Sequence, residues 1–185
     1  MSKNKEKALP RQETKIEGVL AEKGVKILRK QGVEELKAKG YGTDEDDALI
    51  LNFYEALYLV DKGLLEVKDE KGAQMAFNTL LQAAEKTDEN AWAKYLIYRD
   101  LRSRGYVVRE GFGLGVDFRA YERGEYGKDT AKYLILSLQE GKPLTLEALT
   151  QTLKQCQSLK KDLILAVMSR RGEIVYYSVS QLTLK

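Results

Sequence analysis

The chain has 185 residues, 43% of them hydrophobic and 32% charged, with a net charge of +3, which suits one large domain or two small ones. No apolar run approaches the roughly 18–20 residues of a membrane-spanning helix, and the basic start lacks a signal-peptide core, so we expect a cytoplasmic protein that contacts no membrane. One cysteine excludes an internal disulfide, and without histidine no ordinary zinc site is expected, so we predict no metal and no cofactor.

The first forty residues contain signals for a hairpin followed by a helix. Residues 14–20 alternate between apolar and polar as a strand does, and residues 24–28 suit its hairpin partner. Residues 31–39 have the pattern of a short helix that Gly40 would close. We therefore expect a strand pair and one short helix here.

Residues 41–63 begin with a turn and continue into an apolar segment. Thr43 or Asp44 is predicted to cap a helix whose first turn is acidic, and Gly63 would end that helix. The predicted buried stripe of this helix consists of Leu49, Phe53, Ala56, Leu57 and Val60. A short strand at 64–67 and a further helix at 75–86 are expected to follow.

The stretch 95–124 organises the C-terminal half. It opens as a helix in which one side is apolar and aromatic, and that side consists of Tyr95, Leu96, Tyr98 and Leu101. The other side is charged and is predicted to face away from the core; it consists of Arg99, Asp100, Arg102 and Arg104. Gly105 suits the left-handed position after a helix end. Strands are predicted at 106–109 and 116–121, joined by a glycine-rich turn.

The last third reads as strand, helix and two strands. A strand is expected at 131–138, and Thr145 is predicted to cap a helix at 146–160. The predicted buried stripe of this helix is Leu146, Leu149, Leu153, Cys156 and Leu159. A central strand at 162–168 and a final strand at 173–179 follow, joined by a turn at 169–172.

A new helix start near Thr87 predicts two domains, at 1–86 and 87–185. The expected class is α+β, with a small N-terminal mixed α/β domain. The C-terminal domain is expected to be α/β, with a mixed central sheet flanked by helices.

Roughly the last ninety residues contain four stretches in order: YRDLRSRGYVVREG, GVDFRAYERG, KYLILSL and LKKDLILAVMSRRGEIVYYSVS. In these the chain resembles the archaeal tRNA-splicing endonuclease family, in its catalytic C-terminal domain. The N-terminal half carries GYG followed by EALYLVDKG, which resembles that family's N-terminal domain. The resemblance covers about residues 30–183.

The resemblance implies an RNA cleavage that needs no metal. A base removes a proton from a ribose 2′-hydroxyl, an acid protonates the departing 5′-oxygen, and a cation stabilises the phosphate. Products are a 2′,3′-cyclic phosphate and a 5′-hydroxyl. The family's tyrosine falls on Tyr121 and its lysine on Lys161, but Thr130 stands where the family has its histidine. A threonine hydroxyl holds its proton too tightly to replace imidazole as the acid near neutral pH.

Structural alternatives explain the same residues without a substrate. Tyr121 could pack its ring under the loop 122–129, and Lys160 and Lys161 could complement the dipole of the preceding helix. The candidate RNA-binding residues are Lys154, Lys160, Arg119 and Arg123. Lys154 stands where the family often has an arginine that stacks on a base, and a lysine lacks the planar group for that contact.

The final strand and the turn before it form the predicted partner surface. An apolar strand edge at Val175, Tyr176 and Tyr177 would suit a second chain, and the resemblance implies tail-to-tail pairing through this strand. Dimers of the family associate through an acidic loop. The corresponding loop here is basic because it contains Arg170 and Arg171.

These observations favour a structural, non-catalytic subunit of a heteromeric tRNA-splicing endonuclease. Its partner would be a related chain with the full Tyr/His/Lys set, as two copies of each chain, and the substrate would be precursor tRNA with a bulge–helix–bulge. One alternative is a self-sufficient, metal-independent RNA endonuclease that uses Tyr121 and Lys161 with water as the acid. Another is an RNA-binding scaffold without a role in splicing.

Overall fold

The protein is represented by a computed structural model that describes residues 15–28, 32–45, 48–111, 113 and 115–182. The elements of the N-terminal half are β1 (Ile16–Ala21), β2 (Gly24–Ile27), α1 (Val33–Ala38), β3 (Thr43–Glu45), β4 (Ala48–Leu51), α2 (Phe53–Asp61), β5 (Leu65–Lys68), β6 (Gln74–Met75) and α3 (Phe77–Thr87). The elements of the C-terminal half are α4 (Ala91–Ser103), β7 (Val107–Glu110), β8 (Phe118–Tyr121), β9 (Tyr133–Gln139), α5 (Leu146–Ser158), β10 (Asp162–Met168) and β11 (Ile174–Val179). Within these ranges no helix is long and apolar enough to cross a membrane.

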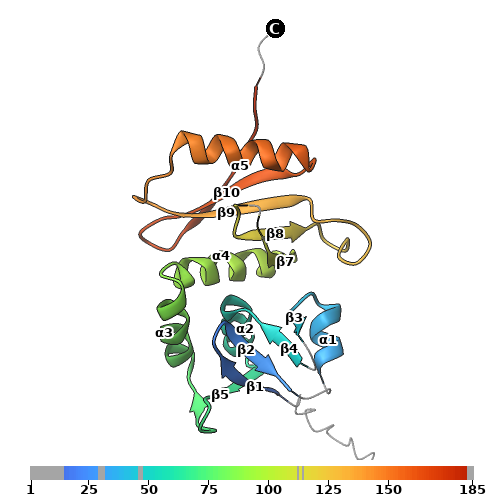
Figure 1. Ribbon diagram of the computed structural model, residues 1–185, viewed down its shortest axis with the longest axis vertical. Helices are drawn as coiled ribbons and strands as arrows, with labels where there is room; N and C mark the ends of the chain where they lie inside the picture. Colours follow the sequence, from blue (N-terminus) through green and yellow to red (C-terminus); the bar gives the residue numbers. More distant parts are fainter. Residues whose placement is uncertain (1–14, 29–31, 46–47, 112, 114, 183–185) are drawn as a thin grey trace, which may run out of the picture.

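Two β-sheets are stacked along the long axis of the molecule, with helices between them (Figure 1). The lower sheet has the strand order β3-β4-β2-β1-β5-β6 and the upper sheet the order β11-β10-β9-β8-β7. Each sheet contains one parallel pair, β1 with β5 and β9 with β10, among antiparallel ones. This arrangement confirms the predicted α+β class with mixed sheets.

The first hairpin forms as predicted, because β1 pairs with β2 in antiparallel register. Gly24 opens β2 at a φ of 152°, where a Cβ atom would lie 2.0 Å from the Leu51 carbonyl oxygen, so only glycine fits. The short helix predicted over residues 31–39 is α1, and residue 31 lies outside the described residues.

The helix start predicted at Thr43 or Asp44 is wrong. Residues 43–45 and 48–51 form the antiparallel strands β3 and β4 instead, and the helix α2 begins only at Phe53. Asn52 caps it, with the Glu55 side chain completing a capping box. Leu49 is buried, but as a strand residue opposite Ile27. The apolar run before Asn52 therefore forms a strand and not a helix, because it pairs with β2.

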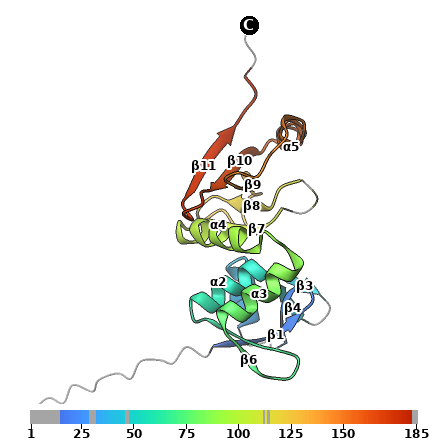
Figure 2. The ribbon, with the colours of Figure 1, turned by 90° about the vertical axis from the view of Figure 1, so that its left-hand side faces the viewer.

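Helix α4 lies between the two halves (Figure 2). It is buried over most of its circumference. Its predicted apolar side is confirmed, with Tyr95 and Tyr98 almost fully buried, and Gly105 follows it at a φ of 89°. Arg102 does not face away from the core as predicted. Its guanidinium carbon lies 4.0 Å from the Tyr41 ring centre, and its Nη2 donates to the Lys39 carbonyl oxygen at 3.0 Å. Because α4 packs on α2 as well as on the upper sheet, its charged side meets protein too.

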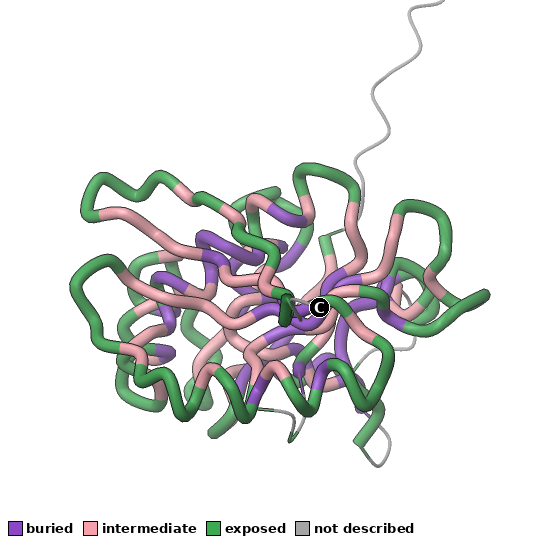
Figure 3. Tube along the Cα trace, turned by 90° about the horizontal axis from the view of Figure 1, so that it is seen from above, coloured by how far each residue is buried: buried purple, intermediate pink, exposed green. Residues whose placement is uncertain are grey.

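The upper sheet has a helix on each face, as predicted. Phe118 and Ala120 face the core beneath, whereas Leu163 packs with Cys156 of α5 on the other face. Thr145 caps α5 as predicted, accepting a hydrogen bond from the Ala148 amide at 3.2 Å. Viewed from above, buried segments run through the middle of the molecule and exposed loops surround them (Figure 3).

Two residues of the stripe predicted for α5 are exposed, and Leu149 and Leu153 are half-buried. Leu146 is 81% exposed and Leu159 is 44% exposed, whereas Cys156 is fully buried. Leu146 stands in the first turn and Leu159 at the C-cap, so only the middle of the helix covers the sheet. The apolar stripe of the sequence therefore extends beyond the part of α5 that packs on the sheet.

A buried charge pair joins the two halves. Glu55 of α2 is 1% exposed and accepts hydrogen bonds from the backbone amides of Gly42, at 3.2 Å, and Asn52, at 3.0 Å. Arg109 of β7 lies 3.5 Å from Glu55 and donates to the Gly40 carbonyl oxygen at 3.1 Å. Burial raises the pKa of Glu55 to about 7, although Arg109 and the two amides oppose that rise.

Candidate functional site

The residues expected to cleave RNA converge at one end of the upper sheet. Tyr133, the first residue of β9, pairs with Ala120 of β8 on one side and with Asp162 of β10 on the other. Tyr121 directly follows Ala120, and Lys161 directly precedes Asp162. The register therefore places Tyr121 and Lys161 on either side of the start of β9.

Thr130 completes this group, because it lies just before β9 and touches Lys161. The Lys161 ammonium donates a hydrogen bond to the Thr130 hydroxyl, and the Thr130 amide donates to Asp129 at 2.6 Å. The structure thus joins a hydroxyl to an ammonium and places a phenol at the same end of the sheet. The ammonium can hold a phosphate, but neither hydroxyl supplies the readily released proton of an imidazolium.

Glu122, the carboxyl group next to Tyr121, is not placed to act as an acid. Glu122, next to Tyr121, accepts hydrogen bonds from the Lys132 ammonium at 2.7 Å and from the Tyr133 hydroxyl at 2.9 Å. Lys132 and Tyr133 hold the pKa of Glu122 below its ordinary value, so Glu122 is ionised at neutral pH. In the described ranges there is also no cluster of three or more acidic or cysteine side chains that could hold a metal ion.

A strained turn fixes the place of Lys161. Lys160 has a φ of 55°, and among the described residues it is the one non-glycine residue with a positive φ. The turn is a Schellman motif in which the Lys161 amide donates to the Cys156 carbonyl oxygen at 2.9 Å. Backbone strain of this kind gathers at functional sites. Here it determines where Lys161 leaves the helix and meets Thr130.

Replacing Lys160 by glycine is expected to raise the free energy of unfolding by roughly 1 kcal/mol, because glycine adopts a positive φ without the Cβ clash. Urea denaturation followed by circular dichroism measures the change. Lys160→Ala is the matched control, since it removes the same charge but keeps the Cβ atom, and it should give no gain. Equal stabilisation by both variants would show that charge, and not backbone strain, limits stability at this turn.

Tyr121 is half-buried, and its ring packs edge-to-face on Tyr126, with ring centres 5.0 Å apart. Tyr126 belongs to the loop 122–129, so the packing alternative for Tyr121 describes a contact that exists. Its catalytic role stays a prediction. Tyr126 was not predicted from the sequence. An aromatic residue between Gly124 and Gly127 does, however, suggest a loop that packs against the protein.

Tyr126 also connects this site with the N-terminal half. At Gly40, where φ is 76°, a Cβ atom would lie 2.4 Å from Val107 Cγ1 and 3.1 Å from Tyr126 Cζ. The turn after α1 therefore presses directly against the site loop. A side chain at Gly40 would displace either β7 or Tyr126.

The four candidate RNA-binding residues do not form one patch of equal exposure. Lys154, Lys160 and Arg123 are exposed, and the Arg123 guanidinium lies 5.8 Å from the Tyr106 ring centre. Arg119 is half-buried opposite Arg109, and within the described part of the chain its Nε makes no hydrogen bond. Their contacts with RNA stay predictions.

The predicted partner surface includes the edge strand of the upper sheet. Val175 and Tyr177 of β11 are 49% and 53% exposed. Tyr176 points the other way, and its hydroxyl donates to Asp100 of α4 at 2.8 Å. Burial and this hydrogen bond raise the pKa of Tyr176. Of the three strand residues, Val175 and Tyr177 are thus available to another chain.

The turn between β10 and β11 carries the two arginines expected at a partner surface. Arg170 and Arg171 are both exposed, and the Arg170 amide donates to Glu140 at 3.0 Å. Their role in association stays a prediction.

Comparison with known proteins matches each half of the chain to a domain of the same family. Residues 91–176 match the family model described as tRNA intron endonuclease, catalytic C-terminal domain, and residues 16–81 match the tRNA intron endonuclease N-terminal domain. A "tRNA-splicing endonuclease" of Methanococcus vannielii is 35% identical over 165 residues, which cover 89% of this chain and 93% of that protein. A "tRNA-splicing endonuclease" of Pyrococcus horikoshii is 32% identical over 165 residues, which cover 89% of this chain and 95% of that protein. One of Methanosarcina mazei is 34% identical over 160 residues, which are only 44% of that relative.

Proposed function

Because the chain belongs to the tRNA intron endonuclease family, we propose that it is a structural, non-catalytic subunit of a heteromeric tRNA-splicing endonuclease. The observation that carries the proposal is Thr130. It stands in the histidine position between Tyr121 and Lys161, and it offers a hydroxyl where the reaction needs an acid. General acid–base catalysis typically contributes on the order of a hundred- to ten-thousand-fold, so a site without it would be very slow.

The partner in this proposal is a related chain that carries the full Tyr/His/Lys set, with two copies of each chain in the complex. The edge of β11 supports such an association. Among the described strands, β11 pairs only with β10, which leaves its other edge with Val175 and Tyr177 open to a strand of the partner. The turn with Arg170 and Arg171 would lie at the rim of that contact.

The proposed substrate is precursor tRNA with a bulge–helix–bulge, handled in the cytoplasm. Lys154, Lys160 and Arg123 place exposed cations on the half of the chain that carries Lys161. Such cations hold the phosphate backbone without reading its sequence. The chain would therefore contribute RNA binding and the placement of its partner, while the partner performs the chemistry.

Cleavage of a bulge–helix–bulge RNA tests the proposal, with this chain alone, the histidine-bearing homologue of the same genome alone, and the two mixed. We expect no cleavage by this chain alone and faster cleavage by the mixture than by the homologue. Cleavage by this chain alone after stringent purification would instead establish a self-sufficient endonuclease that uses Tyr121 and Lys161. Binding of bulged RNA with no effect on the homologue would establish an RNA-binding scaffold.

A further inference from the structure

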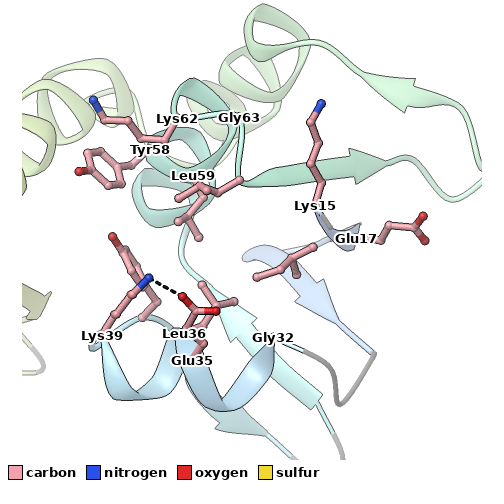
Figure 4. Close-up of a pocket in the computed structure, with 13 residues that line it drawn as sticks. Lys15, Glu17, Gly32, Glu35, Leu36, Lys39, Tyr58, Leu59, Lys62 and Gly63 are labelled. Atoms are coloured by element: carbon pink, nitrogen blue, oxygen red, sulfur yellow. Dashed lines mark hydrogen bonds and ion pairs between the residues drawn. The ribbon is translucent and has the colours of Figure 1, made fainter. Parts of the chain in front are cut away.

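We propose that a cleft in the N-terminal half binds one unpaired nucleotide of the RNA, an inference that rests on the proposed function. The cleft, called here the α1–α2 cleft, lies between α1 and the C-terminal end of α2 and has a volume of about 670 Å³. Figure 4 shows Tyr58 and Lys62 on one wall and Leu36 and Lys39 on the facing wall. Clefts of roughly 300–1,000 Å³ are the usual size of pockets that bind small-molecule ligands.

The α1–α2 cleft offers an aromatic ring beside apolar side chains. Tyr58 is half-buried, and its ring lies 6.4 Å from that of Tyr41 at an interplanar angle of 24°. Leu36 and Leu59 are buried and also line the cleft, and Arg102 lies against the Tyr41 ring from α4. A planar base could therefore lie against Tyr58 on an already ordered support, which is how single-stranded nucleic acids are held.

The charges of the cleft suit a single phosphate. Its walls carry three lysines and two glutamates, a balance of +1 from Lys15, Lys39, Lys62, Glu17 and Glu35. A nucleotide within an RNA chain carries one negative charge, whereas a free nucleoside triphosphate would bring several and meet the two carboxylates. The Lys62 ammonium stands over the Tyr58 ring, 5.6 Å from the ring centre, and in the described ranges it makes no ion pair. It is therefore placed to hold the phosphate of a base stacked on Tyr58.

The cleft is connected to the candidate site through one turn. Tyr41 lines the cleft, and the preceding residue, Gly40, presses against Tyr126 beside Tyr121. In Figure 1, α1 and the loop after β8 lie on the same side of the molecule. An RNA held at the end of the upper sheet could thus extend an unpaired nucleotide into the α1–α2 cleft. A bulge supplies such a nucleotide, and a continuous duplex does not.

Binding by the full chain tests this, measured by fluorescence anisotropy on a bulge–helix–bulge RNA and on a fully paired RNA of equal length. Tyr58→Ala should weaken binding of the bulged RNA by roughly 5- to 150-fold, the range for loss of one stacked base, and leave the paired RNA unchanged. Tyr58→Phe keeps the ring and should bind as the wild type does. Lys62→Met should reduce the slope of log K against log salt concentration by about one, because one phosphate contact is lost. Lys71→Met, an exposed lysine in the β5–β6 turn, is the matched control without effect.

Photo-crosslinking of wild-type protein with 4-thiouridine in the bulge gives a second readout that needs no variant to fold. We expect the label on the α2 segment that contains Tyr58. Bulged RNA that binds normally to Tyr58→Ala and crosslinks only to the C-terminal half would overturn the cleft proposal and leave the proposed function intact. A wild-type chain that binds no bulged RNA, alone or with its homologue, would overturn both. Occupation of the cleft by the homologue instead of RNA would also overturn it.

Discussion

Replacing Thr130 by histidine is expected to raise RNA cleavage by the purified chain by about a hundred- to ten-thousand-fold. The substitution adds an imidazole next to Lys161, in the position that the resemblance assigns to the family's histidine. Thr130 is exposed, so the larger side chain meets no packed neighbour there. Single-turnover cleavage of a bulge–helix–bulge RNA measures the gain, and its rate should fall above the pKa of the new histidine.

Two controls separate restored catalysis from better binding. Thr130→Ala removes the hydroxyl that Lys161 contacts but adds no acid, so it should cleave no faster than the wild type. Tyr121→Phe in the Thr130→His background should abolish the gain, because the proposed base is lost. If Thr130→His stayed inactive while binding RNA normally, the phenol and the ammonium of this chain would not form a working site even with an acid present.

Local backbone requirements were the predictable part of the fold. Gly105 after α4 and Thr145 before α5 were expected from the chemistry of helix ends, which depends on a few neighbouring residues. The helix start at Thr43 or Asp44 was predicted wrongly because the apolar residues 48–51 suit a helix and a strand equally. Only pairing with β2, which no local pattern records, makes residues 48–51 a strand.

The candidate site was predictable where its residues adjoin strands that the sequence patterns locate. Tyr121, Thr130 and Lys161 lie at one end of the upper sheet because each adjoins a strand that the sequence patterns predict. Tyr126 was not predicted, since its contacts with Tyr121 and Gly40 depend on how two distant segments approach. The prediction that Arg102 faces away from the core was wrong for a related reason. A charged side chain is expected in solvent, but α4 has protein on both sides.

Arg109→Met is expected to lower the free energy of unfolding by about 3–5 kcal/mol at pH 8, the usual result of removing one partner of a buried ion pair. It removes the cation that pairs with the Glu55 carboxylate and the donor to the Gly40 carbonyl oxygen. Urea unfolding at pH 5 and at pH 8 measures the effect. The loss should be smaller at pH 5, because Glu55 is then protonated in both folded proteins.

The sign of this dependence follows from the raised pKa of Glu55, which is about 7 in the folded protein against an ordinary value of 4.5. Between these values the folded chain keeps a proton that the unfolded chain has released, so wild-type stability falls as pH rises from 4.5 to 7. Glu55→Gln should remove that slope and reduce the cost of Arg109→Met at pH 8. Equal losses at both pH values would mean that Arg109 acts through Gly40 and not through Glu55. Since Gly40 presses on Tyr126, that outcome would assign Arg109 to holding the site loop against the N-terminal half.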